Sequence, residues 1–389
     1  MGKWELVSVS EVTNILDNKR VPITASERRS GKYPYYGANG VQDYIDNFIF
    51  DDELVLLAED GGNFGSATRP IAYRVSGKCW VNNHAHVLKP KENLDVDYLC
   101  YSIMFYDVLP LISGTTRAKL NKSALSKMLI PLPPLDIQKR IAAALDTANA
   151  LIEKRKEQIE KLDLLIKSQF IEMFGDPVTN PKGWEKKHLE EIANVGSSRR
   201  VFVEELVNEG VPFYRGTEIG AMGTGESITP SLFITSQHYD RLKAVTGVPV
   251  IGDLLMPSIC PDGRIWRVNT IDPFYFKDGR VLWVHFTEKS FDNTYLLYAL
   301  KERIIAEYMN IASGTTFAEL KIFSLKRVSV LLPPLVFQTQ FAEFVQKVEA
   351  QKALLQKSLA DMEQNYQSLL QKCFKGETVS YTHLTLPTT

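Results

Sequence analysis

Leu132-Pro133-Pro134-Leu135 recurs 200 positions later as Leu332-Pro333-Pro334-Leu335, and this doubled stretch decides the fold. The likeness extends in both directions at the same offset. Ser113-Gly114-Thr115-Thr116 returns as Ser313-Gly314-Thr315-Thr316, and Gln138 returns as Gln338, with no gap between them. Self-similarity over such a stretch at a fixed offset is the mark of an internal duplication, and a period near 200 indicates a duplicated domain rather than a solenoid.

Earlier parts of the two halves match more weakly. Trp4-Glu5 aligns with Trp184-Glu185, and Pro34-Tyr35-Tyr36 with Pro212-Phe213-Tyr214, at offsets near 180. The change of offset requires insertions in the second half. The halves are therefore expected to share an architecture while their surfaces have diverged.

Each Pro pair is followed by a helical pattern. Proline disfavours helix in the residue before it but is tolerated in the first turn of a helix, so it marks a helix start. Apolar residues then recur every three or four positions, which predicts two amphipathic helices of roughly 35–40 residues, about 55 Å long at about 1.5 Å per residue. Helices of that length need a partner for the apolar face, and we expect each to pack on the other as a coiled coil. The stripe residues are Ile137, Ile141, Leu145, Ala148, Ile152, Ile159, Leu162, Ile166 and Met173, and then Phe341, Val345, Val348, Leu359, Met362, Tyr366 and Cys373.

The predicted fold class is a mixed α+β chain with two globular domains joined by two long antiparallel helices. Residues 1–134 form the first domain and 135–175 the first helix, which closes at Phe174-Gly175-Asp176-Pro177. Residues 176–334 form the second domain with its entry linker, and 335–376 the second helix. Residues 377–389 lack charge after Glu377 and do not follow the helix register, so we interpret them as a non-native tail.

Composition excludes several classes of protein. The four cysteines are scattered without a Cys-x-x-Cys pair, which favours a cytoplasmic protein without a disulfide framework or a zinc site. The start of the chain lacks a secretion signal, and no apolar run is long enough for a membrane span. The net charge is −1, so a nucleic-acid binder of this composition must concentrate its positive residues locally.

Catalytic motifs are missing from the sequence. A DNA methyltransferase would require a glycine-rich cofactor loop and an Asn/Asp-Pro-Pro-aromatic tetrapeptide, but both Pro pairs here are flanked by leucine. There is no Walker A loop and no nucleophile elbow. The acidic runs Glu59-Asp60 and Asp51-Asp52-Glu53 are interpreted as surface loops rather than as a nuclease site. The chain is therefore predicted not to be an enzyme.

A globular domain, a Pro pair and a long helix, all repeated once, resemble the specificity subunits of type I restriction-modification systems. The Ser-Gly-Thr-Thr segments, Ile130–Leu135 with Gln138, and the run from Phe174 to Trp184 carry the likeness, which covers residues 1 to 376. The doubled set at one offset is the specific signal, because Leu-Pro-Pro-Leu alone is common.

This resemblance implies a non-catalytic DNA-binding subunit with two target recognition domains, each reading one half of a bipartite, gapped DNA site. The helices would set the gap and dock two methyltransferase subunits, through which endonuclease subunits join the complex. The chain itself would bind no cofactor, whereas its partners would use S-adenosylmethionine, ATP and Mg²⁺.

Candidate DNA contacts follow from residue chemistry, because Lys and Arg suit phosphates while Arg, Asn and Gln suit base edges. The first domain offers a basic–aromatic stretch, a glycine-rich loop and an Asn-Asn-His run. The alternatives are a solvated loop, a structural hairpin and ordinary hydrogen bonding at a strand edge. His84 and His86 lack a third metal ligand at useful spacing. The candidates are Lys19, Arg20, Arg28, Arg29, Lys32, Tyr36, Asn63, Arg69, Asn82 and Asn83.

The segment from Ser113 to Lys122 carries three positive and no negative side chains, which favours a phosphate clamp over a simple helix cap and turn. Its candidates are Ser113, Thr115, Thr116, Arg117, Lys119 and Lys122. The second copy is a weaker basic patch. In the second domain the candidates are Arg199, Arg200, Tyr214, Arg215, Arg264, Arg267, Thr315, Thr316 and Lys321.

Two other functions fit the same pattern. A specificity subunit of a nuclease-free methyltransferase or phage-defence complex would look alike in sequence, and neighbouring genes would distinguish the two. A coiled-coil scaffold with two protein-binding domains is an alternative of another class. The basic–aromatic clusters and the divergence between the halves count against the scaffold.

Overall fold

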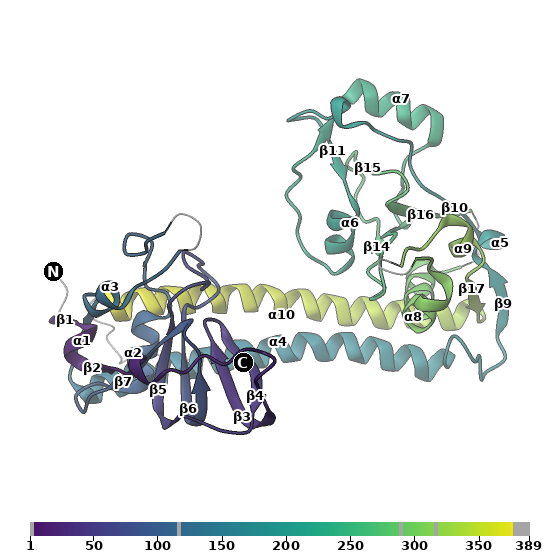
Figure 1. Cartoon of the computed structure of the whole chain (residues 1–389). Coiled ribbons are helices and arrows are strands. Elements are labelled where there is room, and N and C mark those ends of the chain that lie inside the picture. Colours follow the sequence, from purple (N-terminus) through teal and green to yellow (C-terminus); the bar gives the residue numbers. More distant parts are fainter. Residues whose placement is uncertain (1–3, 115–117, 288–290, 315–317, 376–389) are drawn as a thin grey trace. The chain divides into compact units, whose positions relative to one another are not determined.

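The computed structural model describes residues 4–114, 118–287, 291–314 and 318–375, and the chain divides into two units (Figure 1). Unit 1 contains residues 1–157 and 356–389, and unit 2 contains residues 158–355. Both boundaries fall inside a long helix, α4 (Leu135–Phe174) or α10 (Leu335–Lys375). Each unit therefore combines one mixed domain with one half of each long helix.

Unit 1 is built around a six-stranded sheet with the order β2-β7-β5-β6-β3-β4. Neighbouring strands are antiparallel except β3 and β6, which run parallel. A second, two-stranded sheet pairs β1 with β8. The elements are β1 (Leu6–Ser8), α1 (Val9–Val12), β2 (Thr13–Ile15), η1 (Asp17–Lys19), β3 (Ser30–Gly37), β4 (Gly40–Ile45), β5 (Phe50–Ala58), β6 (Ala72–Val81), β7 (Ala85–Pro90), α2 (Val96–Ile103), α3 (Lys122–Ser126) and β8 (Leu129–Pro131).

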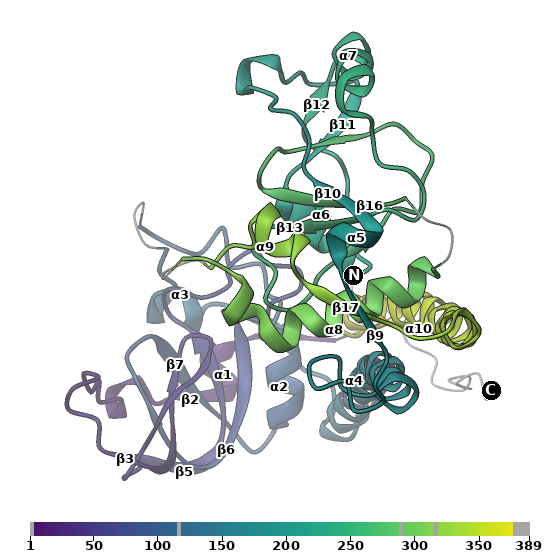
Figure 2. The same cartoon turned by 90° about the vertical axis from the view of Figure 1, so that its right-hand side faces the viewer.

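The central strand β5 is buried on both faces. Because side chains alternate along a strand, Val55 and Leu57 face one apolar cluster while Leu54 and Leu56 face another. The first cluster includes Leu99 of α2 and, beyond it, Ile141 in the first half of α4. Helix α2 thus lies between the sheet and α4 (Figure 2).

Unit 2 contains a four-stranded sheet, β10-β16-β13-β14, and a three-stranded sheet, β12-β11-β15, while β17 pairs with β9. Its elements are β9 (Glu185–His188), α5 (Leu189–Ile192), β10 (Ala193–Gly196), η2 (Val203–Glu205), β11 (Val211–Tyr214), α6 (Gly216–Gly223), β12 (Phe233–Ile234), α7 (Ser236–Thr246), β13 (Leu254–Pro257), β14 (Trp266–Arg267), β15 (Tyr275–Phe276), β16 (Val281–Phe286), α8 (Asn293–Ile311), α9 (Ile322–Lys326) and β17 (Ser329–Leu332).

The two domains share one parallel strand pair at equivalent positions but differ in the elements that follow it. Tyr36 of β3 lies beside Val81 of β6 in a parallel pair, and Tyr214 of β11 lies beside Phe276 of β15 in the same way. In unit 1 the single strand β6 pairs with both β5 and β3. In unit 2 two separate strands make the equivalent pairings, β14 with β13 and β15 with β11. After the equivalent tyrosines, unit 1 continues into strand β4 whereas unit 2 continues into helix α6. Divergence therefore begins next to Tyr36 and Tyr214.

The long helices pack antiparallel within each unit. In unit 1, Leu145 of α4 shares a core with Leu370 of α10, whereas in unit 2 Ile166 of α4 shares a core with Val345 of α10. All of the predicted stripe residues except the half-buried Ile159 lie in or against these two cores, and the fold class is confirmed. Phe170, which the stripe did not include, is fully buried and packs its ring 5.6 Å from that of Phe341.

A buried glutamine anchors the start of each long helix. The Gln138 amide accepts a hydrogen bond from the Asp95 backbone N–H at 2.8 Å and donates to the Pro133 carbonyl at 2.8 Å. Gln338 repeats this with Asp292 at 3.0 Å and Pro333 at 2.7 Å. Each glutamine therefore ties the Pro-Pro turn to the first residue before α2 or α8, which explains why it recurs at the fixed offset.

The end of α4 is also defined by side chains. Gly175 adopts a φ of 80°, a left-handed conformation that favours glycine after a helix. Trp184 Nε1 donates to the Phe174 carbonyl at 3.0 Å and Lys182 Nζ to the Met173 carbonyl at 2.9 Å. These bonds satisfy carbonyls that the helix itself leaves without partners. The tail proposed for residues 377–389 lies outside the described residues.

Replacing Gln338 by leucine should lower the free energy of unfolding by about 1–3 kcal/mol, because the Asp292 N–H and the Pro333 carbonyl would lose a buried partner. Urea unfolding followed by circular dichroism measures this loss. Gln340→Leu, at an exposed position two residues further along the same helix, is the matched control. Equal stability of the two variants would contradict the anchoring role.

Candidate DNA interface

Four connections of unit 1 meet at one end of its large sheet. They are the turn Gly37–Gly40, the connection Glu59–Ile71, the turn Asn82–His84 and the described ends of the loop Ser113–Lys119, and we call them the loop end of unit 1. The Asn39 amide donates to the Gly61 carbonyl at 2.9 Å, and Asp60 forms a β-bridge with Lys119. Segments far apart in the sequence thus form one polar surface.

Unit 2 builds a loop end from equivalent connections: Tyr214–Gly216, Ser258–Ile265, Lys277–Arg280 and the described ends of Ser313–Glu319. The backbone pattern is the same in both units. Leu120 N–H donates to the Glu59 carbonyl at 2.8 Å and Leu320 N–H to the Ser258 carbonyl at 2.7 Å. The N–H groups of Glu59 and Ser258 each donate at 2.9 Å, to the carbonyls of His84 and Arg280 respectively.

These matching bonds define equivalent positions. Glu59 corresponds to Ser258, His84 to Arg280, and Lys119 to Glu319. Tyr36 and Tyr214 are equivalent by the same reasoning, because their carbonyls accept from the backbone N–H groups of Asn82 at 3.0 Å and Lys277 at 2.9 Å. The two loop ends are thus one scaffold carrying different side chains.

A cluster of ionisable side chains lies beneath the loop end of unit 1. His86 Nδ1 is 2.6 Å from an Asp17 carboxylate oxygen, and Arg20 donates to Glu59 at 2.6 Å. Lys119 approaches the other oxygen of Glu59 at 2.9 Å. The interpretation of Glu59-Asp60 as a surface loop was wrong, since both residues are buried. The reason is that their charges have partners from segments distant in the sequence.

The pKa values reflect these contacts. Burial alone would raise the pKa of Glu59, but the hydrogen bonds from Lys119 and Arg20 hold it below its ordinary value. Burial likewise opposes ionisation of Asp17, whose pKa is held low by His86. Asp17, Glu59 and His86 lie close enough to hold a metal ion. Arg20 and Lys119 already neutralise the carboxylates, so the arrangement fits an internal ion-pair network better than a metal.

Two of the candidate DNA contacts, Arg20 and Asn82, form hydrogen bonds within the protein. The Arg20 guanidinium also donates to the Ala85 carbonyl at 2.8 Å. Asn82 is only 3% exposed, and its amide donates to Gln42 at 3.0 Å. Asn83 and Lys19, by contrast, are exposed.

The basic stretch of unit 1 extends along β3. Arg29 precedes the strand and Lys32 is its third residue, whereas Tyr36 is its seventh, so Lys32 and Tyr36 are roughly 13 Å apart at about 3.3 Å per residue. Arg28 also precedes the strand, but its side chain approaches the Asp43 carboxylate at 3.5 Å. Arg28 lies over the Tyr35 ring at 4.2 Å and Lys32 over the Tyr33 ring at 5.3 Å.

The remaining candidates of unit 1 lie on or near the loop end. Arg69 is exposed, and the half-buried Asn63 donates to the Pro70 carbonyl at 3.4 Å. Ser113 is exposed, and Lys122 is the exposed first residue of α3. Five candidates fall outside the described residues, namely Thr115, Thr116, Arg117, Thr315 and Thr316.

Most candidate cations of unit 2 have an acidic partner nearby. Arg200 approaches Asp278 at 3.1 Å and Lys321 approaches Glu319 at 2.7 Å. Arg264 pairs with Asp262 at 2.6 Å. The first pair connects two loops, whereas the other two pairs join residues two positions apart in the same segment.

Three further candidates complete unit 2. Arg215 pairs with Glu218 at 2.5 Å, and the pKa of Glu218, which burial would raise, is lowered to about 2 chiefly by this guanidinium. Arg267 donates to the Thr294 hydroxyl. Arg199 is exposed, while its backbone N–H donates to the Tyr275 hydroxyl at 2.9 Å.

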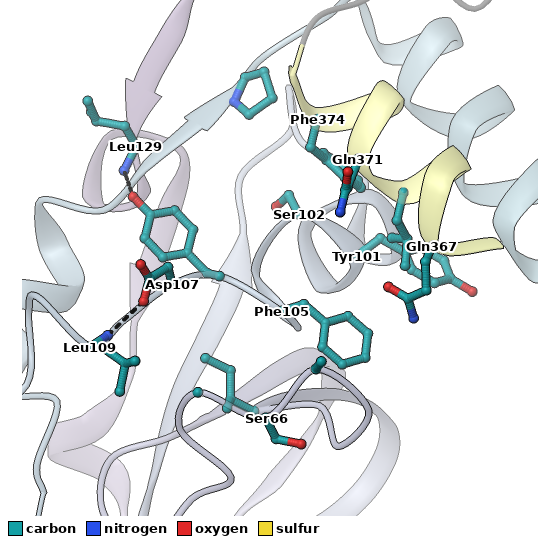
Figure 3. A pocket seen from close by; sticks show the side chains of 16 residues that line it. Ser66, Tyr101, Ser102, Phe105, Asp107, Leu109, Leu129, Gln367, Gln371 and Phe374 are labelled. Carbon is teal, nitrogen blue, oxygen red and sulfur yellow. Dashed lines mark hydrogen bonds between the residues drawn. The ribbon is translucent and has the colours of Figure 1, made fainter. Parts of the chain in front are cut away.

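A cleft of about 590 Å³ in unit 1 lies between the Gly65–Ala67 loop and the last turns of α10 (Figure 3). Phe105, Leu109 and Phe374 contribute much of its apolar lining. Asp107 is its one acidic residue and accepts from the Leu109 N–H at 3.1 Å. The described lining includes no Lys, Arg or His, so the cleft does not suit a phosphate.

Among the described residues no helix is long and apolar enough to cross a membrane. The four cysteines are buried and free. Two mixed domains that present different side chains on one repeated scaffold, with a shared pair of helices, define a two-domain recognition subunit. The chain belongs to the family of type I restriction modification DNA specificity domains, whose model matches residues 1–161 and again 181–364. It is thus a non-catalytic DNA specificity subunit of a type I restriction-modification system.

Individual relatives agree along almost the whole chain. A Haemophilus influenzae protein named as a type I restriction enzyme specificity subunit is 32% identical over 348 residues, covering 88% of this chain and 86% of the relative. The MjaVIII specificity subunit of Methanocaldococcus jannaschii is 24% identical, covering 89% and 86%. The crystal structure of the type I restriction-modification S subunit from M. genitalium matches the fold with a TM-score of 0.55 at 16% identity, covering 96% of both chains.

Removing the buried guanidinium with Arg20→Met should destabilise the protein by roughly 3 kcal/mol at neutral pH, because Asp17 and Glu59 would lose a cation. Both pKa values are depressed in the folded state, so unfolded carboxylates bind protons first as the pH falls. The stabilisation is therefore fully present above the ordinary carboxyl range and is lost below it. The difference from the wild type should shrink as the pH falls below about 4.5.

Urea midpoints measured between pH 7 and pH 3 give this difference directly. Arg200→Met is the control, since its side chain is 68% exposed and its ion pair lies on the surface. A deficit in Arg20→Met that stays constant across the whole pH range would argue against the ion-pair network.

Proposed function

We propose that each mixed domain is a target recognition domain that reads one half of a bipartite, gapped DNA site. The domains are assigned to residues 1–134 and 176–334, and the two long helices to 135–175 and 335–376. The observation that carries this proposal is the pair of loop ends, which repeat one backbone scaffold with different side chains. Two unlike surfaces on equivalent scaffolds suit two unlike half-sites.

Exposure of the side chains supports some of the proposed DNA contacts more than others. Asn83, Arg69 and Lys19 are exposed and remain candidates in unit 1, as do Arg199 and Arg215 in unit 2. Arg20 and Asn82 are better assigned to supporting the loops from beneath, because their polar atoms bond to Glu59 and Gln42. Arg29 precedes β3 and would contact a different stretch of DNA backbone from the loop end, whereas Arg28 is paired with Asp43.

The helix pair is proposed to set the gap between half-sites and to dock the methyltransferase subunits. Helix α4 is continuous over 40 residues, about 60 Å at about 1.5 Å per residue, and a packed helix pair is stiff. Two leucines on the pair face solvent in unit 2, with Leu164 61% and Leu354 70% exposed. A contiguous apolar patch on a surface marks a site where a partner binds, and we propose that these two leucines belong to such a site.

In such a complex the methyltransferase subunits would use S-adenosylmethionine, and translocating endonuclease subunits would use ATP and Mg²⁺. We place the complex in the cytoplasm, in keeping with the free cysteines. A nuclease-free complex would place the same demands on this chain, and the identity of the co-purifying subunits distinguishes the two.

Co-expression with the methyltransferase subunit, followed by genome-wide mapping of methylated bases, tests the proposed function. We expect one asymmetric motif made of two short specified halves separated by a fixed unspecified gap. Replacing residues 1–134 with the corresponding domain of a relative should change one half-motif and leave the other intact. A continuous motif from an active complex would contradict the proposal.

The spacer role of the helices predicts a change in gap length. Inserting seven residues into α4 after Glu157 and seven into α10 after Leu355 should lengthen the pair by about 10 Å. Since base pairs rise about 3.4 Å, the gap should grow by about three base pairs while both half-motifs stay the same. The same insertion in α4 alone should instead lower the melting temperature, because the two apolar stripes would lose register. A gap unchanged by the double insertion would count against a spacer role.

A further inference from the structure

The position that closes the Ser-Gly-Thr-Thr loop has opposite charges in the two units. Lys119 and Glu319 occupy equivalent places, because each exchanges two backbone hydrogen bonds with the serine that opens its loop. Lys119 and Ser113 are joined by bonds of 2.8 and 2.9 Å, and Glu319 and Ser313 by two bonds of 2.9 Å. In each unit this residue therefore forms the base of the loop.

In unit 1 the loop supplies the cation and the sheet supplies the anion. Lys119 Nζ lies 2.9 Å from Glu59 Oε1, at the end of β5. The Glu59 side chain is 11% exposed, whereas that of Lys119 is 50% exposed. Glu59 is also fixed by Arg20, so the lysine approaches an anion that is already held in place.

In unit 2 the polarity is reversed. Glu319 pairs with Arg280, which stands at the equivalent of His84 just before β16. The Glu319 side chain is 19% exposed and that of Arg280 is 58% exposed. Lys321 holds the other carboxylate oxygen at 2.7 Å and, with Arg280, keeps the pKa of Glu319 below its ordinary value. The loop now supplies the anion and the turn beside the sheet supplies the cation.

An acid in the second copy is hard to reconcile with phosphate binding by this position. DNA repels a carboxylate, yet an ion pair is present at the base of the loop in both units, although the loop residue has the opposite charge and its partner stands at a different position. An ion pair kept at this place under a reversal of charge indicates that the pairing matters, and not the sign of the loop residue.

We propose that residues 119 and 319 are positioning residues whose ion pairs hold each loop on its own domain for DNA recognition, and that their opposite polarity makes the two loops non-interchangeable. This proposal rests on the proposed function, because the experiments below measure DNA binding and methylation. A loop carrying glutamate, transferred to unit 1, would place a carboxylate next to Glu59 and Asp60, and like charges at that distance repel.

The first experiment uses the complex of the full chain with its methyltransferase subunits and a duplex carrying the mapped motif. Glu319→Gln removes one negative charge from a DNA-binding surface. If charge alone mattered, this variant would bind DNA more tightly. A positioning role predicts weaker binding, by about fivefold, because the bonds to Arg280 and Lys321 are weakened.

Lys119→Met gives the complementary test in unit 1. Loss of a phosphate contact would reduce the slope of log affinity against log salt by about 0.9. Loss of a positioning contact should weaken binding and leave that slope unchanged. Lys127→Met is the matched control, an exposed lysine nearby that is not among the candidate DNA contacts. Tighter binding by Glu319→Gln, or a reduced salt slope for Lys119→Met, would overturn the proposal.

The second experiment exchanges the loops. Replacing residues 113–119 by the sequence of 313–319 should abolish motif-specific methylation. Adding Glu59→Ser and His84→Arg, which transfers the partner residues of unit 2, should restore at least part of it. Full activity of the simple exchange would disprove non-interchangeability, and so would a failure of the partner changes to improve on it, provided that circular dichroism shows both variants folded. If the wild-type complex methylates no gapped motif, the proposed function itself fails instead.

Discussion

The buried glutamine that follows each Pro pair is the constraint on which the rest of the molecule depends. Gln138 bonds at once to the backbone ahead of α2 and to the Pro-Pro turn, and Gln338 does the same for α8. In each unit, neutral hydrogen bonds thus hold together the start of the long helix, the Pro-Pro turn and the residue before α2 or α8. The glutamine is buried, so water does not compete for these bonds. The direction of each long helix relative to its own domain follows from these bonds, so the strands and loops could diverge while the frame stayed the same.

The sequence predicted the two long helices and the duplication correctly, because both leave short-range, periodic patterns of residues. Leu145 and Val345 recur at helical spacing, and the Pro pairs mark both helix starts, so the duplication, the two helices and the mixed domains were all legible. The candidate interface was harder, since it is assembled from loops that are distant in sequence. Nothing near Glu59 indicated that Arg20 and Lys119 would neutralise it, and nothing in the basic run indicated that Arg28 would pair with Asp43.

Candidate cations are paired with carboxylates in both halves, as Arg20 and Lys119 show in unit 1. Candidate cations of unit 2 such as Arg200 and Arg264 sit against carboxylates, which agrees with a chain whose net charge is −1. A paired guanidinium presents less free charge to a phosphate, so binding to arbitrary DNA should be weak. It can still offer directed N–H groups to a base edge. Such a surface favours discrimination between sequences over attraction to any sequence.

Both unit boundaries fall in the middle of a long helix, and this affects the order in which the two units can fold during synthesis. Unit 2 is continuous in sequence, so all of its core is present once residue 355 has left the ribosome. The core of unit 1 includes Tyr366, Leu370 and Cys373 from the last turns of α10. The domain made first must therefore wait for the end of the chain, across a loop of about 200 residues, whose closure carries an entropic cost. Of the two recognition surfaces, the one nearer the N-terminus is the last to be completed.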